Sequence, residues 1–178
     1  MGRLLLILIS YLFISKFSFN FADETYIIPP FKFAEFCHRY PSECIVTKGK
    51  KIIWNYKTKK YFSELNIRVN KQIIEIPSEI PLENEIWLLF PKEGQCHDYV
   101  VSKRHELIKT GYSSSDLLLA EVITQNDLHH LVLIIKTDKG DFIMDSLRND
   151  VYPIELMEYR LLRMQSSENP NYWVKNTA

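Results

Sequence analysis

The chain has 178 residues, in which 22 Lys and Arg balance 22 Asp and Glu, so its formal net charge at pH 7 is +0. Hydrophobic residues make up 46% of the chain, which is enough for the core of one ordinary domain. The balanced charge excludes a global field that would draw the protein to nucleic acid or to an anionic membrane surface.

The first residues have the pattern of a secretory signal peptide. Arg3 gives a short cationic start, and residues 4–14 are almost entirely apolar. This run is too short for a transmembrane helix, which needs about 20 residues. We therefore expect residues 1–22 to be removed on export, with cleavage near Ala22. Residues 23–178 are then expected to form one mature domain without a membrane span.

Three cysteines are informative in an exported chain, because disulfides persist outside the cytoplasm. Cys37 and Cys44 lie seven residues apart with Pro41 between them, which favours a small local disulfide. The alternatives are two small buried side chains, or a metal site with His38 that lacks a fourth ligand. Cys96 is then unpaired, so it is either buried and inert or kept free because its thiolate does chemistry.

The first half of the mature chain is predicted to hold two helices. In residues 56–73 apolar residues recur at three- and four-residue steps, and lysines occupy the opposite face, which predicts an amphipathic helix. The other expected elements are an extended segment over 26–30, a short helix over 31–39, a short strand over 51–55 and a proline-rich loop over 77–91. A loop of this kind can wall a cleft.

The second half is predicted to combine a helix with three strands. Residues 96–110 fit a helix, because Gly94 gives a flexible entry and Gly111 a stop. Residues 137–140 have the pattern of a hairpin turn. Strand-like runs lie at 117–124, 128–136 and 141–147, of which the last two flank this turn.

The tail is expected to form a further helix over residues 154–164, with Trp173 packing late in the chain. The elements together predict an α+β domain in which the helix that starts at Cys96 packs on a small antiparallel sheet.

Cys96, two histidines and one aspartate follow one another in an order that suits thiol chemistry. A cysteine at a helix start lies against backbone N–H groups, which stabilise its thiolate. His129 and His130 open one strand, and Asp145 lies on the strand paired with it, where a carboxylate can orient an imidazole. Side chains alternate along a strand, so only one histidine points into the site, and the pattern alone leaves that choice open. Each residue alone is more often structural, so their order carries the catalytic interpretation.

These residues belong to a longer set of motifs. The set comprises Phe36-Cys37 with Pro41 and Cys44, Val69-Asn70, Trp87, Pro91, Cys96, Asp98-Tyr99, Lys103, Gly111, His130-Leu131-Val132-Leu133, Gly140-Asp141 and Asp145-Ser146-Leu147. With them the chain resembles the bacterial transglutaminase-like cysteine proteinases over nearly the whole mature chain. This family includes the LapG-type periplasmic proteases that release surface adhesins.

The resemblance implies a papain-like or transglutaminase-like core and a thiol protease that acts through a thioester. It assigns the nucleophile to Cys96, the base to His130 and the orienting carboxylate to Asp145, which resolves the choice between the two histidines. It also implies a periplasmic location and a protein or peptide substrate, for which a surface adhesin is a candidate.

The chain departs from the family's pattern in two places. The acidic residues that flank the nucleophile, and that bind calcium in the adhesin-releasing members, are replaced by Gln95 and His97, so two hard oxygen ligands are missing. We therefore expect no cofactor. Asp98 is a weak calcium candidate, and its place in the first helical turn suits a cap equally well. The second departure is Ser146 in place of asparagine, which leaves Asp145 unchanged.

The same triad supports more than one function. Peptide hydrolysis, glutamine deamidation and acyl transfer to an amine share the thioester, so the fold and the triad do not decide among them. The rival from another class is a catalytically inactive exported module that binds peptides, in which the altered flanks of Cys96 mark a lost activity. A reactive Cys96 favours the enzyme, and a buried inert thiol favours the module.

Overall fold

The computed structural model describes residues 25–76 and 85–175. The expected signal peptide, residues 1–22, lies outside the described residues, and so does the stretch 77–84 of the expected loop. In the two described ranges, no helix combines the length and the apolar character needed to cross a bilayer. The signal peptide and its cleavage site remain predictions from the sequence.

In the described residues, the three helices come before most of the strands, and the sheet forms mainly from the second half of the chain. The helices are α1 Phe31–Arg39, α2 Tyr56–Gln72 and α3 Cys96–Lys109, with short 3-10 turns η1 Pro41–Cys44, η3 Ser114–Asp116 and η4 Ile154–Leu156. The strands are β1 Tyr26–Ile27, β2 Ile74–Glu75, β3 Glu93–Gly94, β4 Leu117–Ile123, β5 His129–Thr137, β6 Gly140–Met144, β7 Tyr152–Pro153, β8 Arg160–Gln165 and β9 Trp173–Lys175. The predicted α+β class is confirmed.

The helices expected from residues 31, 56 and 96 are confirmed, and local chemistry explains their ends. α2 begins after Asn55, whose side chain accepts a hydrogen bond from the Thr58 N–H at 3.0 Å. Its apolar stripe, which includes Phe62 and Val69, is buried. Beyond the C-terminus of α3, Gly111 has φ +95°, a left-handed conformation that glycine adopts without strain.

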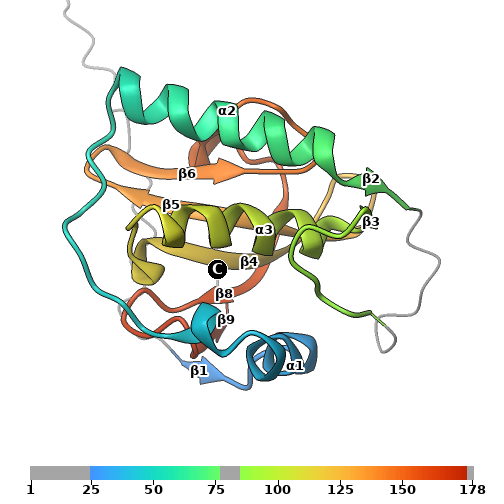
Figure 1. Cartoon of the computed structure of the whole chain (residues 1–178). Coiled ribbons are helices and arrows are strands. Elements are labelled where there is room, and N and C mark those ends of the chain that lie inside the picture. Colours follow the sequence, from blue (N-terminus) through green and yellow to red (C-terminus); the bar gives the residue numbers. More distant parts are fainter. Residues whose placement is uncertain (1–24, 77–84, 176–178) are drawn as a thin grey trace, which may run out of the picture.

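Seven strands form one antiparallel sheet in the order β1-β9-β8-β4-β5-β6-β7. The hairpin of β5 and β6 pairs Thr137 with Gly140, which confirms the predicted turn. Apolar side chains cover both faces of the central strands, so the core has a part on each side of the sheet. α3 packs against β5, and Figure 1 shows α3 across the sheet with α2 beside it. This packing holds the start of α3 close to the start of β5.

The expected helix over residues 154–164 is wrong. Only its first turn is helical, as η4, and residues 160–165 form β8 between β4 and β9. A register shift in the pairing at Glu121–Val122 lets Leu161 and Met164 face the same core cluster, although they are three residues apart. The spacing of these two residues is therefore also the spacing expected in a helix. The segment forms a strand because it pairs with the otherwise open edge of β4.

The expected strand over residues 51–55 is also wrong. Of this segment only Ile52 makes a bridge, to Thr137. The parallel pair of β2 and β3, in which Ile74 lies opposite Glu93, was not expected from the sequence. It joins the end of α2 to the segment that leads into α3.

Cys37 of α1 and Cys44 of η1 are joined by a disulfide, with their Cα atoms 5.6 Å apart. Pro41 begins the η1 turn that returns the chain toward α1. Because each sulfur is bonded to the other, neither is available with His38 as a metal ligand. Cys96 is the free cysteine of the described residues.

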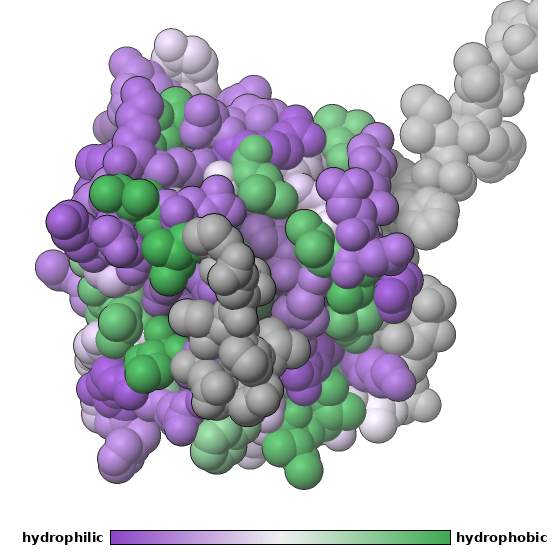
Figure 2. Space-filling model, turned by 90° about the vertical axis from the view of Figure 1, so that its right-hand side faces the viewer, coloured by the Kyte–Doolittle hydropathy of each residue, from purple (hydrophilic) through white to green (hydrophobic). Residues whose placement is uncertain are grey.

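One side of the molecule shows how polar and apolar side chains are distributed over the surface there. Figure 2 shows a mainly hydrophilic face on which apolar side chains form small separate groups. Scattered apolar residues of this kind are ordinary on protein surfaces.

Candidate active site

Cys96 is the first residue of α3, at the end of the helix where backbone N–H groups have no partner within the helix. The carboxylate of Asp98 stabilises this end, because its Oδ2 accepts the Gln95 N–H at 2.9 Å and its Oδ1 accepts the Leu88 N–H at 2.7 Å. A Cβ at Gly94 would lie 2.6 Å from Asp98 Oδ2, so this close approach requires glycine. The contacts hold the loop before the helix and fix where Cys96 lies.

His130 and Asp145 form a buried hydrogen-bonded pair. His130 Nε2 lies 2.7 Å from Asp145 Oδ1. An ionised carboxylate only accepts, so Nε2 carries a proton and Nδ1 is the nitrogen that remains for another partner. Burial alone would raise the pKa of Asp145. Hydrogen bonds from His130, from the Leu147 N–H at 3.0 Å and from the Tyr159 hydroxyl at 3.0 Å lower it below its usual value.

Cys96 and His130 line the same cleft, and each shifts the pKa of the other. Burial raises the pKa of the Cys96 thiol, but hydrogen bonds to His130 and His97 outweigh this effect and lower the pKa to about 6. Burial lowers the pKa of His130, but its hydrogen bonds to Asp145 and Cys96 raise it to about 9. Between these two pH values the pair is a thiolate and an imidazolium, the reactive form of a nucleophilic cysteine. The structure thus brings together the three residues singled out by their order in the sequence.

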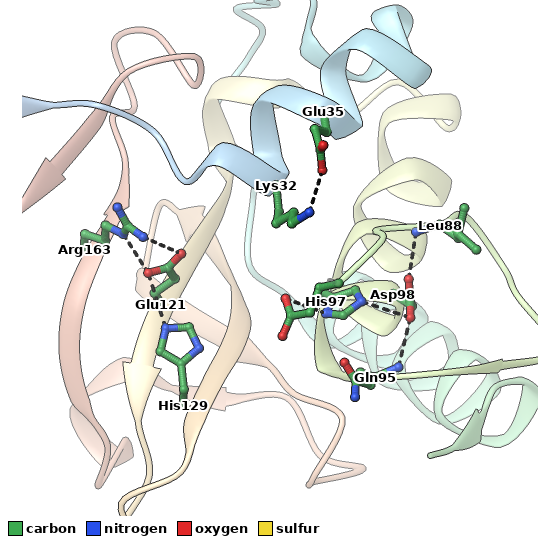
Figure 3. A network of polar contacts seen from close by, with 10 residues as sticks. Lys32, Glu35, Leu88, Gln95, His97, Asp98, Glu121, His129 and Arg163 are labelled. Carbon is green, nitrogen blue, oxygen red and sulfur yellow. Dashed lines mark hydrogen bonds and ion pairs between the residues drawn. The ribbon is translucent and has the colours of Figure 1, made fainter. Parts of the chain in front are cut away.

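His129 has different partners from its neighbour. Its Nε2 lies 3.5 Å from Glu121 Oε2, whereas Arg163 donates to the same carboxylate from Nε at 2.6 Å and from Nη2 at 3.1 Å. Figure 3 shows this cluster across the cleft from His97. Neighbouring side chains alternate along β5, so His130 and not His129 bonds to Asp145.

His97 adjoins Cys96 on α3 and is buried against the preceding loop. Its ring stacks on Trp87, with a distance of 5.6 Å between the ring centroids and an angle of 10° between the ring planes. Nε2 lies 3.2 Å from Asp98 Oδ2, and Nδ1 lies 3.5 Å from Glu85 Oε2. Burial lowers the pKa of His97, but the bonds to Asp98 and Cys96 raise it to about 9. His97 is therefore a cation at neutral pH.

A cleft of about 900 Å³ runs past these groups. Its walls come from the start of α1, from the segment that leads into α3, from the adjoining ends of β4 and β5, and from the residues after β6. The lining includes Phe31, Trp87, Cys96, His97, Glu121, Leu128, His129, His130, Leu147 and Arg163. Such a cleft suits an extended polypeptide, with Cys96 and His130 at the place where a carbonyl would lie.

The surroundings of Asp98 fit a helix cap and not a calcium site. Its oxygens accept backbone N–H groups from Leu88 and Gln95 and lie beside the cationic ring of His97, so they face donors rather than a space for a metal. Within residues 25–76 and 85–175, no group of three or more His, Cys, Asp or Glu side chains is arranged to hold a metal ion. The residues around Cys96 therefore do not fit calcium.

Several contributors to the site were missed by sequence reasoning. Tyr159, which bonds to Asp145, lay inside a helix that does not form, and Glu85 lay in a loop without periodicity. The pair of Glu121 and Arg163 joins strands that are distant in the sequence, so no local signal marks it. The only local hint in the sequence was Gly94 before the helix that starts at Cys96, because a glycine in such a place often marks a close approach of another group to the backbone.

Comparisons with known proteins agree with this architecture. A family model described as bacterial transglutaminase-like cysteine proteinase BTLCP matches residues 24–178. The chain is similar in structure to calcium-bound LapG of Legionella pneumophila, with a TM-score of 0.58 and 17% identity over 82% of this chain and 79% of LapG. For EGTA-treated LapG of the same organism the TM-score is 0.57, with 17% identity over 82% and 77% of the two chains. No curated protein sequence matches the chain.

Proposed function

Because the chain belongs to the bacterial transglutaminase-like cysteine proteinases, we propose that it cleaves proteins with a triad of Cys96, His130 and Asp145. The family and the transglutaminase-like core predicted from the motifs are confirmed, and so is the cysteine protease class. The roles of the three residues are our proposal. One observation carries it: His130 is hydrogen-bonded to Asp145 and lines the same cleft as Cys96, whose thiol pKa it lowers.

In the proposed mechanism the Cys96 thiolate attacks the carbonyl carbon of the substrate and forms a carbon–sulfur bond. The backbone N–H of Cys96 stabilises the resulting oxyanion. His130 gives its proton to the leaving amine as the carbon–nitrogen bond breaks, which leaves a thioester. His130 then takes a proton from the water that attacks the thioester, and the carbon–sulfur bond breaks, which releases the acid and restores the thiolate. Asp145 holds the imidazole and stabilises its cationic form.

The proposed hydrolysis predicts a bell-shaped pH profile. We expect degradation of casein by the purified mature protein to rise as the pH passes about 6, where Cys96 loses its proton, and to fall above about 9, where His130 loses its own. Pretreatment with iodoacetamide should abolish cleavage, because the alkylated sulfur cannot attack. Full activity after stoichiometric alkylation of Cys96 would rule out the proposed nucleophile.

Deamidation and acyl transfer remain alternatives within the same chemistry, because they differ from proteolysis in the bond cleaved or in the acceptor of the acyl group. We propose water as the acceptor and a peptide bond as the target, since the family is one of proteinases. Mass spectrometry of the treated casein separates the outcomes, through new peptide termini, a gain of about one mass unit per glutamine, or incorporation of an added amine. The inactive binding module is disfavoured by the low pKa of Cys96.

We also propose where the enzyme acts. The N-terminal pattern supports removal of residues 1–22 and action of the domain 23–178 in the periplasm. The substrate is then a protein accessible from that compartment, with a surface adhesin as the candidate. Fractionation of cells that produce the full chain, with N-terminal sequencing of the recovered protein, tests both the compartment and the cleavage site.

Calcium is not expected to be required. One of the similar LapG structures is calcium-bound, but here the flanks of the nucleophile are Gln95 and His97, and Asp98 caps the helix. We expect casein cleavage after treatment with EGTA to stay within about twofold of the rate in millimolar calcium, because no step uses the ion. A loss of more than tenfold that calcium restores would contradict this proposal.

A further inference from the structure

His97 is a buried cation next to the nucleophile, and the proposed mechanism does not use it. Its side chain is 4% exposed, and one face of its ring is covered by Trp87. The two nitrogens lie toward Asp98 and Glu85, which come from different segments of the chain. Figure 3 shows the ring held at the start of α3 beside Asp98.

The position of these carboxylates decides the protonation of the ring. A carboxylate can only accept a hydrogen bond. Each ring nitrogen can therefore donate to its carboxylate only if it carries hydrogen, and both nitrogens carry hydrogen only in imidazolium. Burial opposes the charge, but the buried oxygens of Asp98 and the thiolate of Cys96 attract it strongly at low dielectric. The stack on Trp87 and the two carboxylates leave the ring of His97, the residue next to Cys96, little freedom to turn.

We propose that His97 is a second cationic partner of the Cys96 thiolate, held by Glu85, Asp98 and Trp87, and that it keeps the sulfur ionised while His130 transfers protons. The inference rests on the proposed function, which makes Cys96 the nucleophile. A single imidazolium partner disappears whenever His130 gives its proton to the leaving group. A second one that does not take part in the transfer remains, and it disfavours protonation of the leaving thiolate when the acyl group departs.

Other charged groups face the same space and enter the pH dependence. His130 with Asp145 acts directly on Cys96, and the buried cluster of Glu121, Arg163 and His129 lies across the cleft. Lys32 of α1 is paired with Glu35 at 2.9 Å. The positive groups that lower the pKa of the Cys96 thiol are His130 and His97.

The test is the rate of alkylation of Cys96 by iodoacetamide as a function of pH, with the midpoint of the profile as readout. In His97→Gln we expect the midpoint to rise by about one pH unit or more, because an opposite charge next to the thiolate is lost. In the double variant His97→Gln/His130→Ala it should reach at least about 8.5, the ordinary value for a thiol, because burial then raises the pKa of Cys96 with neither histidine to oppose it. His130→Ala alone should stay below that value, since His97 remains.

The matched control is His105→Gln. His105 lies on the same helix and its Nδ1 is 2.6 Å from Glu43 Oε1, but it is not a partner of Cys96, so the midpoint should not move. If His97→Gln does not fold, Glu85→Gln keeps the imidazole and removes one of its carboxylates, and a smaller upward shift is expected.

The outcomes separate this inference from the proposed function. A folded His97→Gln or Glu85→Gln variant with the wild-type midpoint overturns the role of His97 and leaves the triad intact. A midpoint in His130→Ala alone that equals the midpoint of the double variant does the same, because nothing is then left for His97 to supply. A low midpoint in the wild type without any proteolysis overturns the proposed function and not the second cation.

Discussion

Replacing Cys96 with alanine is expected to lower kcat/KM for protein cleavage by at least about 10⁴-fold, because no other group in the cleft can form the thioester. The serine and threonine hydroxyls of the described cleft lining belong to Thr124 and Ser146, and neither is hydrogen-bonded to His130 in the structure. The measurement is the initial rate of release of a fluorophore from labelled casein, at an enzyme concentration high enough to detect the residual activity.

The control for Cys96→Ala is the fold of the variant. The thiol is only partly buried, so its loss should change the thermal midpoint by no more than a few degrees. A variant that melts like the wild type and has lost cleavage assigns the chemistry to the sulfur. A stable variant that retains more than a tenth of the activity would show that another residue is the nucleophile.

Replacing His130 with alanine is expected to lower kcat/KM by about 10³- to 10⁴-fold, because the thiolate loses its ion-pair partner and the leaving amine loses its proton donor. Alkylation of Cys96 at pH 6 should slow in the same variant, since the pKa of the thiol rises. Steady-state cleavage and labelling followed by intact mass measure the two effects in one preparation.

The matched control is the adjacent histidine. His129 bonds to Glu121 and not to Asp145, so His129→Ala should cost less than about tenfold, through the shape and charge of the cleft. If His129→Ala proved to be the more damaging change, the assignment of the base to His130 would be wrong. The pair of variants therefore tests the choice that strand periodicity alone left open.

Much of the fold could be predicted because its signals are local. The stripe of Phe62 and Val69 defines α2 within a few turns, and Gly111 ends α3 because it adopts a conformation that few other residues tolerate. The hairpin at Thr137 and Gly140 depends on four consecutive residues. Segments whose conformation depends on distant partners were predicted less well, as β8 shows.

The candidate site divides in the same way. The helix start at Cys96 and the strands that carry His130 and Asp145 could be expected from nearby residues, whereas the choice between His129 and His130 came from the family resemblance. The structure places His130 within hydrogen-bonding distance of Asp145 and in the same cleft as Cys96.

The sequence by itself determined the family, the kind of chemistry and the order of its residues, because motifs and helix ends are encoded over a few neighbouring positions. Only the tertiary structure decided the partners of the site. Glu85, in the loop before α3, lies 3.5 Å from His97. Tyr159 donates a hydrogen bond to Asp145 from a segment whose apolar residues are spaced as in a helix. Such contacts depend on how separate elements pack against one another, so no pattern within one helix or strand records them.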